Sequence, residues 1–153
     1  MTRRSYALGI AAVEMVIVLP LVLLLLTPVA EIGRAFIQYS RLSHRVQVGA
    51  RFVADNAYKG STGVPSLTPA VRQQALNLVL YGKSVSSGQD PLAVPELTAD
   101  DLFIEVSSSG LVTLSADYTY RPMIAGVLPL FGFGDDLDIS ALKLRPRTVM
   151  RAL

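Results

Sequence analysis

The sequence predicts an α+β protein with a long N-terminal helix, a second short helix and a small antiparallel three-stranded sheet. Three observations predict this class: a long apolar segment near the N-terminus, helical periodicity within residues 31–82, and alternating apolar residues within residues 102–120. Because the helical segments precede the strand segments instead of alternating with them, the pattern favours α+β over a parallel α/β fold.

Residues 10–30 are apolar apart from one charged residue, Glu14. As a helix this segment is about 31 Å long, which matches a hydrocarbon core of roughly 30 Å. An ionised side chain at the centre of such a helix costs roughly 2.5–3.5 kcal/mol, so Glu14 is a candidate functional residue. The apolar fraction of 51% also indicates that part of the chain lies in lipid. We therefore predict a transmembrane helix over residues 10–30.

The helical pattern continues past the span as an amphipathic extension over residues 31–58. Apolar residues recur there every three or four positions, while Arg34, Gln38, Arg41 and Arg45 lie on another face. We expect the apolar stripe to pack on the rest of the domain and the helix to end near the glycines of residues 60–63. The stripe consists of Ile32, Phe36, Tyr39, Leu42, Val46, Ala50, Val53 and Ala57.

Residues 59–153 are predicted to form a small α+β domain that begins with a short helix. Thr68 can cap that helix, and Pro69 fits its first turn because a proline there forgoes no helical hydrogen bond. Tyr81 and Gly82 mark its end. The polar residues 83–101, which include two prolines, are expected to form a surface loop.

The strands are predicted from alternation with a period of two. Residues 102–106 and 111–120 form a hairpin around the turn 107–110, and a third strand follows near residues 139–144. Between them, residues 122–134 are apolar but rich in glycine and proline, so we expect a loop that covers one end of the core.

The composition argues against several functions. The chain has no cysteine, so disulfides and thiolate chemistry are not available. Its formal charge is +2, but the basic residues are dispersed, and we expect no nucleic-acid partner. The single histidine, His44, lies beside Arg45 on the exposed side of the helix, and a working base needs an orienting partner. We expect no enzyme activity and no cofactor.

The acidic residues do not predict a metal site. Asp135, Asp136 and Asp138, like the pair Asp100 and Asp101, do not follow the spacing of a defined calcium loop. Aspartate is a preferred residue in turns and caps, so we interpret these side chains as solvated caps of turns.

Two export signals fit residues 3–30 in part. A secretory signal cleaved after Ala30 fits the basic start and the apolar middle, but Pro28 stands where a small residue is wanted. A twin-arginine signal is suggested by Arg3 and Arg4, but such signals serve folded and often cofactor-loaded cargo, for which the sequence shows no motif.

A third possibility is cleavage after Gly9. Ile10 would then be the new N-terminus and Glu14 the fifth residue, one helical turn from a free amine. That amine is a natural ionic partner for Glu14, within one chain or between stacked chains. Cleavage would also remove two of the 14 basic residues, which leaves basic and acidic residues balanced at 12 each.

This N-terminal pattern resembles the TadE-like pseudopilins of the tight adherence (Flp) pilus system. The resemblance is carried by Gly9-Ile10-Ala11-Ala12-Val13-Glu14, Val18-Leu19-Pro20-Leu21, Glu31-Ile32-Gly33-Arg34 and Gly49-Ala50-Arg51. Residues 80–82, 94–98 and 103–120 fit the family's periplasmic part. The sequence departs from related prepilins at Met15, where an aromatic residue is common, and at Thr27-Pro28.

The resemblance implies a pilin-like fold and a minor pilin or assembly factor. Residues 1–9 would be a leader removed after Gly9 by a prepilin peptidase, with Ile10 as the new terminus and Glu14 as the recognised acidic residue. The implied partners are inner-membrane lipid, the prepilin peptidase and other pilins or pseudopilins. The implied location is the bacterial inner membrane, with a cytoplasmic N-terminus, one span and a periplasmic domain.

Two alternatives stay open. Arg34, Arg41, Arg45 and Arg51 follow the span, and by the positive-inside rule they favour a cytoplasmic C-terminal domain. The chain can also be interpreted as a signal-anchored or secreted periplasmic binding module unrelated to pili, with residues 122–134 as its ligand or partner surface.

Overall fold

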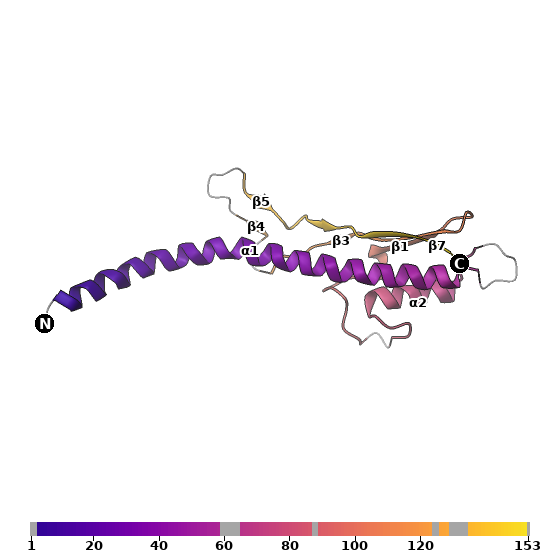
Figure 1. Ribbon diagram of the computed structural model, residues 1–153, viewed down its shortest axis with the longest axis horizontal. Coiled ribbons are helices and arrows are strands. Elements are labelled where there is room, and N and C mark those ends of the chain that lie inside the picture. The colour runs from indigo at the N-terminus through magenta and orange to yellow at the C-terminus, as the bar shows by residue number, and fades with distance from the viewer. Residues whose placement is uncertain (1–2, 59–64, 87–88, 124–125, 129–134, 153) are drawn as a thin grey trace. The chain divides into compact units, whose positions relative to one another are not determined.

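The computed structural model describes residues 3–58, 65–86, 89–123, 126–128 and 135–152 (Figure 1). These residues confirm the α+β class, with a long apolar N-terminal helix, a second helix and a three-stranded antiparallel sheet. The chain forms two compact units. One consists of Met1–Arg34 and Arg121–Ser140, and the other of Ala35–Tyr120 and Ala141–Leu153.

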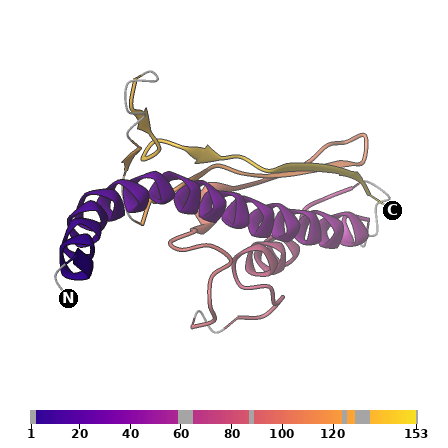
Figure 2. The same ribbon diagram turned by 60° about the vertical axis from the view of Figure 1, so that its left-hand side comes forward.

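The long helix α1 spans Arg3–Asn56 without interruption, although Pro20 and Pro28 lie inside it. Each proline removes one backbone hydrogen bond. The ribbon curves in its indigo part but does not break (Figure 2). The Thr27 hydroxyl donates a hydrogen bond of 2.9 Å to the Leu23 carbonyl, in the turn that precedes Pro28. The predicted glycine end at 60–63 lies outside the described residues.

The first unit adds a small hairpin to the N-terminal part of α1. Strand β4 (Val127–Leu128) pairs antiparallel with β5 (Leu137–Asp138). The Ile139 amide donates to the Gly126 carbonyl at 2.8 Å, which extends the pairing by one bond. This hairpin lies where an apolar loop was predicted over residues 122–134, of which 124–125 and 129–134 are outside the described residues.

The second unit contains the main sheet, with strand order β1-β2-β7 and antiparallel pairing throughout. The predicted hairpin is confirmed for β1 (Leu102–Val106) and β2 (Leu111–Ala116). Gly110 closes its turn with a φ of +80°, a conformation that L side chains rarely adopt. The second strand is shorter than the predicted range 111–120, because β2 ends at Ala116. A separate strand, β3 (Tyr118–Thr119), follows it.

The predicted position of the third strand was wrong. The strand that completes the sheet is β7 (Arg147–Arg151), while residues 143–144 form β6 (Lys143–Leu144), which pairs with β3. Strand β7 lies at the edge of the sheet, and its residues alternate between exposed and half-buried. An edge strand of this kind needs no strong apolar alternation, so its sequence gives little signal.

Helix α2 (Pro69–Leu80) begins and ends as predicted. The Thr68 hydroxyl accepts a hydrogen bond of 3.3 Å from the Val71 amide, and Pro69 occupies the first turn. Gly82 has a φ of +76°, and its amide donates to the Leu78 carbonyl at 3.0 Å. The predicted loop before β1 contains a short 3-10 helix, η1 (Ala99–Asp101).

Within the second unit, α1 packs between α2 and the sheet, as both views indicate (Figures 1 and 2). The three elements approach closely at Gly49, where an added Cβ would lie 2.7 Å from Val79 of α2 and 3.1 Å from Leu114 of β2. The core gathers the apolar faces of all three elements. Its fully buried members include Leu42, Val46, Ala50, Val53, Ala75, Val79, Val112, Leu114 and Tyr120.

The predicted apolar stripe of α1 is confirmed only from Leu42 onward. Ile32, Phe36 and Tyr39 are exposed, contrary to the prediction. The buried positions of this stretch are Glu31, Ala35 and Gln38. The apolar pattern there therefore belongs to the exposed side of the helix, and burial falls on a face that carries two polar residues.

Candidate functional site

The predicted processing segment lies within α1. Gly9 and Ile10 belong to the helical backbone, and Glu14 follows one turn later with an exposed side chain. Glu14 makes no hydrogen bond or ion pair within the part of the chain that the structure describes. Ile10 contributes a peptide nitrogen to α1, so the ionic pair expected between an Ile10 amine and Glu14 would require the expected cleavage after Gly9.

The helix that carries these residues is long and apolar enough to cross a membrane, by length and composition. Its large apolar side chains from Val13 to Val29 are exposed to the surroundings of the molecule. A helix that is apolar on all sides and not buried is typical of a membrane span. A signal sequence near the N-terminus has the same properties.

Glu31 is the functional candidate that sequence reasoning missed. Its side chain is only 1% exposed, and its Oε1 atom accepts a hydrogen bond of 2.7 Å from the Met123 amide. The Arg34 guanidinium lies 3.6 Å from the same oxygen. A buried carboxylate is stable only with such partners, so Glu31 ties residues 121–123 to α1 within the first unit. The spacing of three residues between Glu31 and Arg34 was visible in the sequence, whereas the contact with Met123 was not.

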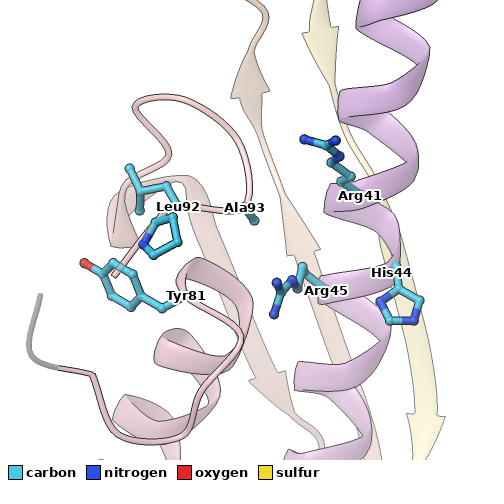
Figure 3. A pocket seen from close by; sticks show the side chains of 7 residues that line it. Arg41, His44, Arg45, Tyr81, Leu92 and Ala93 are labelled. Carbon is cyan, nitrogen blue, oxygen red and sulfur yellow. The ribbon is translucent and has the colours of Figure 1, made fainter. Parts of the chain in front are cut away.

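A pocket of about 320 Å³ opens on the second unit, beside α1. Arg41, Arg45 and His44 line it from the helix, and Tyr81 and the chain at residues 91–93 line it from the other side. Figure 3 shows Arg41 and Arg45 projecting toward Leu92 and Tyr81, with His44 on the other side of the helix. A second pocket of about 280 Å³ lies next to His44 and includes Gln47 and Arg51.

The walls of this pocket are fixed by backbone contacts. The Ala93 amide donates to the Leu80 carbonyl at 2.8 Å, which holds the loop beside the end of α2. Gly82 leaves room for the Arg45 guanidinium, since a Cβ at residue 82 would collide with it. Lys83 and Asp90 form an ion pair of 2.6 Å that closes the intervening loop.

Asp101 and Asp138 cap turns, as was predicted for them. Asp101 accepts hydrogen bonds from the Thr98 amide and hydroxyl, at 2.9 and 2.8 Å. Asp138 accepts from the Ser140 amide at 2.8 Å and from its hydroxyl. The Ser140 hydroxyl, with the backbone amide, lowers the pKa of Asp138 below its ordinary value.

Comparison with known proteins finds a similarity in the N-terminal part of the chain. Residues 9–51 match the family model described as TadE-like protein, which confirms the resemblance. The match contains Gly9, Ile10, Glu14, Glu31 and Arg34. No curated protein and no solved structure matches the chain. Over residues 9–51 the chain is therefore similar to TadE-like proteins.

Proposed function

We propose that the protein is a minor pilin, or pseudopilin, that takes part in the assembly of tight adherence (Flp) type IV pili. The observation that carries the proposal is the family match, which begins at Gly9 and includes Glu14. Cleavage after Gly9 by a prepilin peptidase would leave Ile10 as the first residue of the mature chain and Glu14 as the fifth. The partners are then inner-membrane lipid, the peptidase and other pilins of the same system.

The action proposed for the mature chain is mechanical. The apolar part of α1 holds the subunit in the bilayer until assembly, and the exposed apolar side chains then become available to neighbouring subunits. The Ile10 amine and the Glu14 carboxylate would pair within one chain or between stacked chains. A single pair of polar groups in an apolar bundle fixes the register between helices.

The proposed orientation is a cytoplasmic N-terminus and a periplasmic C-terminal domain. The arginines after the span oppose it by the positive-inside rule. Arg34, however, is paired with the buried Glu31, so it is not a free positive charge. A periplasmic domain should be protected from protease in inverted inner-membrane vesicles and digested in spheroplasts. The reverse result would overturn this orientation.

Mass spectrometry of the mature N-terminus tests the processing step. A chain that begins at Ile10 supports the pilin function, and an intact Met1 terminus contradicts it. A chain that begins at Glu31 would favour the alternative, an exported periplasmic module. Gly9→Leu is expected to block cleavage because a large side chain replaces hydrogen next to the scissile bond. Gly33→Leu is the matched control, since an added Cβ at Gly33 meets nothing within 4 Å.

A further inference from the structure

The segment that Glu31 holds against α1 exposes an apolar side chain. The Met123 amide donates to the Glu31 carboxylate, yet the Met123 side chain is 78% exposed. Val127, on β4 of the same unit, is exposed as well. Residues 122–134 carry no charge, and they were expected to cover one end of the core. At Met123 and Val127 the apolar side chains face the surroundings of the molecule instead.

The contact with Glu31 sets the level of Met123 along the helix. Glu31 directly follows residue 30, where the predicted span ends, and one residue advances a helix by only about 1.5 Å. Helical side chains lean toward the N-terminus, so the Glu31 carboxylate lies over the last turn of the span. The Met123 amide lies 2.7 Å from that carboxylate. Met123 therefore lies at the end of the apolar segment, whichever side of the membrane the domain occupies.

Burial on the Glu31 side of α1 begins inside the predicted span. Thr27 and Pro28 lie about one turn before Glu31 and are half-buried. Residues 12–26 and 29–30 are exposed. The first unit therefore has a covered face of α1 at a level that the hydrocarbon core reaches.

Charged groups limit how deeply this part of the chain can enter a bilayer. Arg34 pairs with Glu31 and lies one turn beyond it, about 4.5 Å further from the core. Asp138 stands opposite Val127 in the hairpin, and residues 135–136 are exposed aspartates. Carboxylates are costly in the hydrocarbon region, so the hairpin stays at the level of headgroups or water. A contact with lipid is therefore shallow and falls on Met123 more than on Val127.

We propose that residues 121–123 form a second contact with the bilayer, at the boundary between the headgroups and the acyl chains. The Met123 side chain would enter this layer beside the end of the span, held there by Glu31. Lipid is favoured over a neighbouring protein because the exposed side chains of Val29 and Ile32 lie at the same level of α1, where the span meets lipid. The inference rests on the membrane anchorage in the proposed function.

A second contact would restrict rotation of α1 about its own axis. A helix that is apolar on all sides has no preferred face toward lipid. The connection to Met123 leaves α1 on the Glu31 side, so that side would stay beside residues 121–123. Val29 is two residues earlier and so lies about 160° around the helix from Glu31. Its exposed side of α1 would remain free for other subunits.

Tryptophan fluorescence tests the contact in the full chain reconstituted into bilayers. The chain has no tryptophan, so Met123→Trp and Leu21→Trp each place a single fluorophore at an exposed position. The quenchers are phosphatidylcholines brominated near the carbonyl end or near the methyl end of the acyl chain. Met123→Trp is expected to be quenched severalfold more strongly by the carbonyl-end bromines, because the contact is shallow. Leu21→Trp, in the middle of the span, should show the reverse order.

Val85→Trp is the matched control. Val85 is 77% exposed, but it lies in a polar loop beside the ion pair of Lys83 and Asp90. Brominated lipids should quench Val85→Trp severalfold less than Met123→Trp. Equal quenching of these two variants, or no lipid quenching of Met123→Trp, overturns the proposal. Protection of Met123→Trp from both brominated lipid and aqueous acrylamide also overturns it, in favour of a protein contact.

The Leu21→Trp variant distinguishes this inference from the function on which it rests. Lipid quenching of Leu21→Trp without quenching of Met123→Trp contradicts only the second contact and leaves the pilin function standing. Absence of lipid quenching in both variants contradicts the membrane anchorage itself.

Discussion

At the scale of single residues, the buried carboxylate of Glu31 joins α1 to residues 121–123 within the first unit. We expect Glu31→Gln to weaken this contact, because the amide keeps an acceptor for the Met123 N–H but loses the charge beside Arg34. Loss of a charged hydrogen bond costs about 1–3 kcal/mol, so amide exchange at Met123 should rise roughly tenfold or more. Hydrogen-exchange mass spectrometry of residues 121–128 measures it. Glu105→Gln, on an exposed strand position, should leave this exchange unchanged.

Gly82 supports the arginine pocket through a conformation that other residues rarely adopt. Gly82→Ala would introduce a Cβ at a φ of +76° that collides with the Arg45 guanidinium. We expect a loss of roughly 1–2 kcal/mol in the free energy of unfolding, with Arg45 displaced from the pocket. Chemical denaturation measures the stability. Gly33→Ala is the control and should be neutral or stabilising, because its surroundings are open and alanine is the better helix former.

The sequence identifies single residues well where their role is local. The Thr68 cap, the Gly82 helix end and the aspartate turn caps depend only on neighbours within a few positions, and the structure confirms them. The burial of Glu31 depends on Met123, which is 92 positions away along the chain. No local pattern contains that contact, so the burial of Glu31 could not be predicted from the sequence.

At the scale of elements, the packing of α1 against α2 and β2 depends on the missing side chain of Gly49. We expect Gly49→Leu to destabilise the second unit by about 1–3 kcal/mol, because the new side chain must displace Val79 and Leu114. Urea denaturation followed by circular dichroism measures the loss. An unchanged midpoint would show that α1 does not approach the other two elements as closely as described. Gly33→Leu again supplies the exposed helical control.

The short pairing of β3 with β6 is reinforced by an ionic cluster that responds to pH. A hydrogen bond from Arg145, with the nearby charge of Lys143, lowers the pKa of Asp117 below its ordinary value of 3.8. The ionised carboxylate therefore stabilises the fold above that value, and the contribution is lost as the pH falls through the lower pKa of the folded state. Asp117→Asn should flatten the stability profile below pH 3.8. Arg145→Gln should raise the pKa of Asp117, measured by carboxyl NMR.

Elements were predictable where one face is buried, and less so at edges. In β1 and β2 the apolar residues recur at every second position, and in α2 at every third or fourth position, so the sequence located both correctly. Strand β7 is an edge strand without a clear apolar face. The third strand was therefore predicted at residues 139–144, which are more apolar. In α1 the periodicity of residues 32–39 is real, but periodicity does not tell whether an apolar face meets a core or lipid.

At the scale of the whole molecule, the central prediction concerns Glu14 and assembly. We expect Glu14→Ala to insert into the membrane at least as well as the native chain, because an apolar helix loses its only charge between residues 10 and 30. Pilus assembly should nevertheless fail, since the mature Ile10 amine would lack its ionic partner. Membrane fractionation and surface pilus counts measure the two effects separately.

The N-terminal residue found in each Glu14 variant distinguishes two roles of the carboxylate, register between subunits and recognition by the peptidase. If Glu14→Ala is cleaved at Ile10 but forms no pili, Glu14 acts in register between subunits. If the variant keeps its leader, Glu14 acts in recognition by the peptidase. Glu14→Gln separates charge from hydrogen bonding, because it keeps a polar side chain of the same length but cannot pair with an ammonium group as an ion. Normal pili in both variants would exclude an ionic register role. The interactions of the mature span would then have to come from its apolar side chains alone.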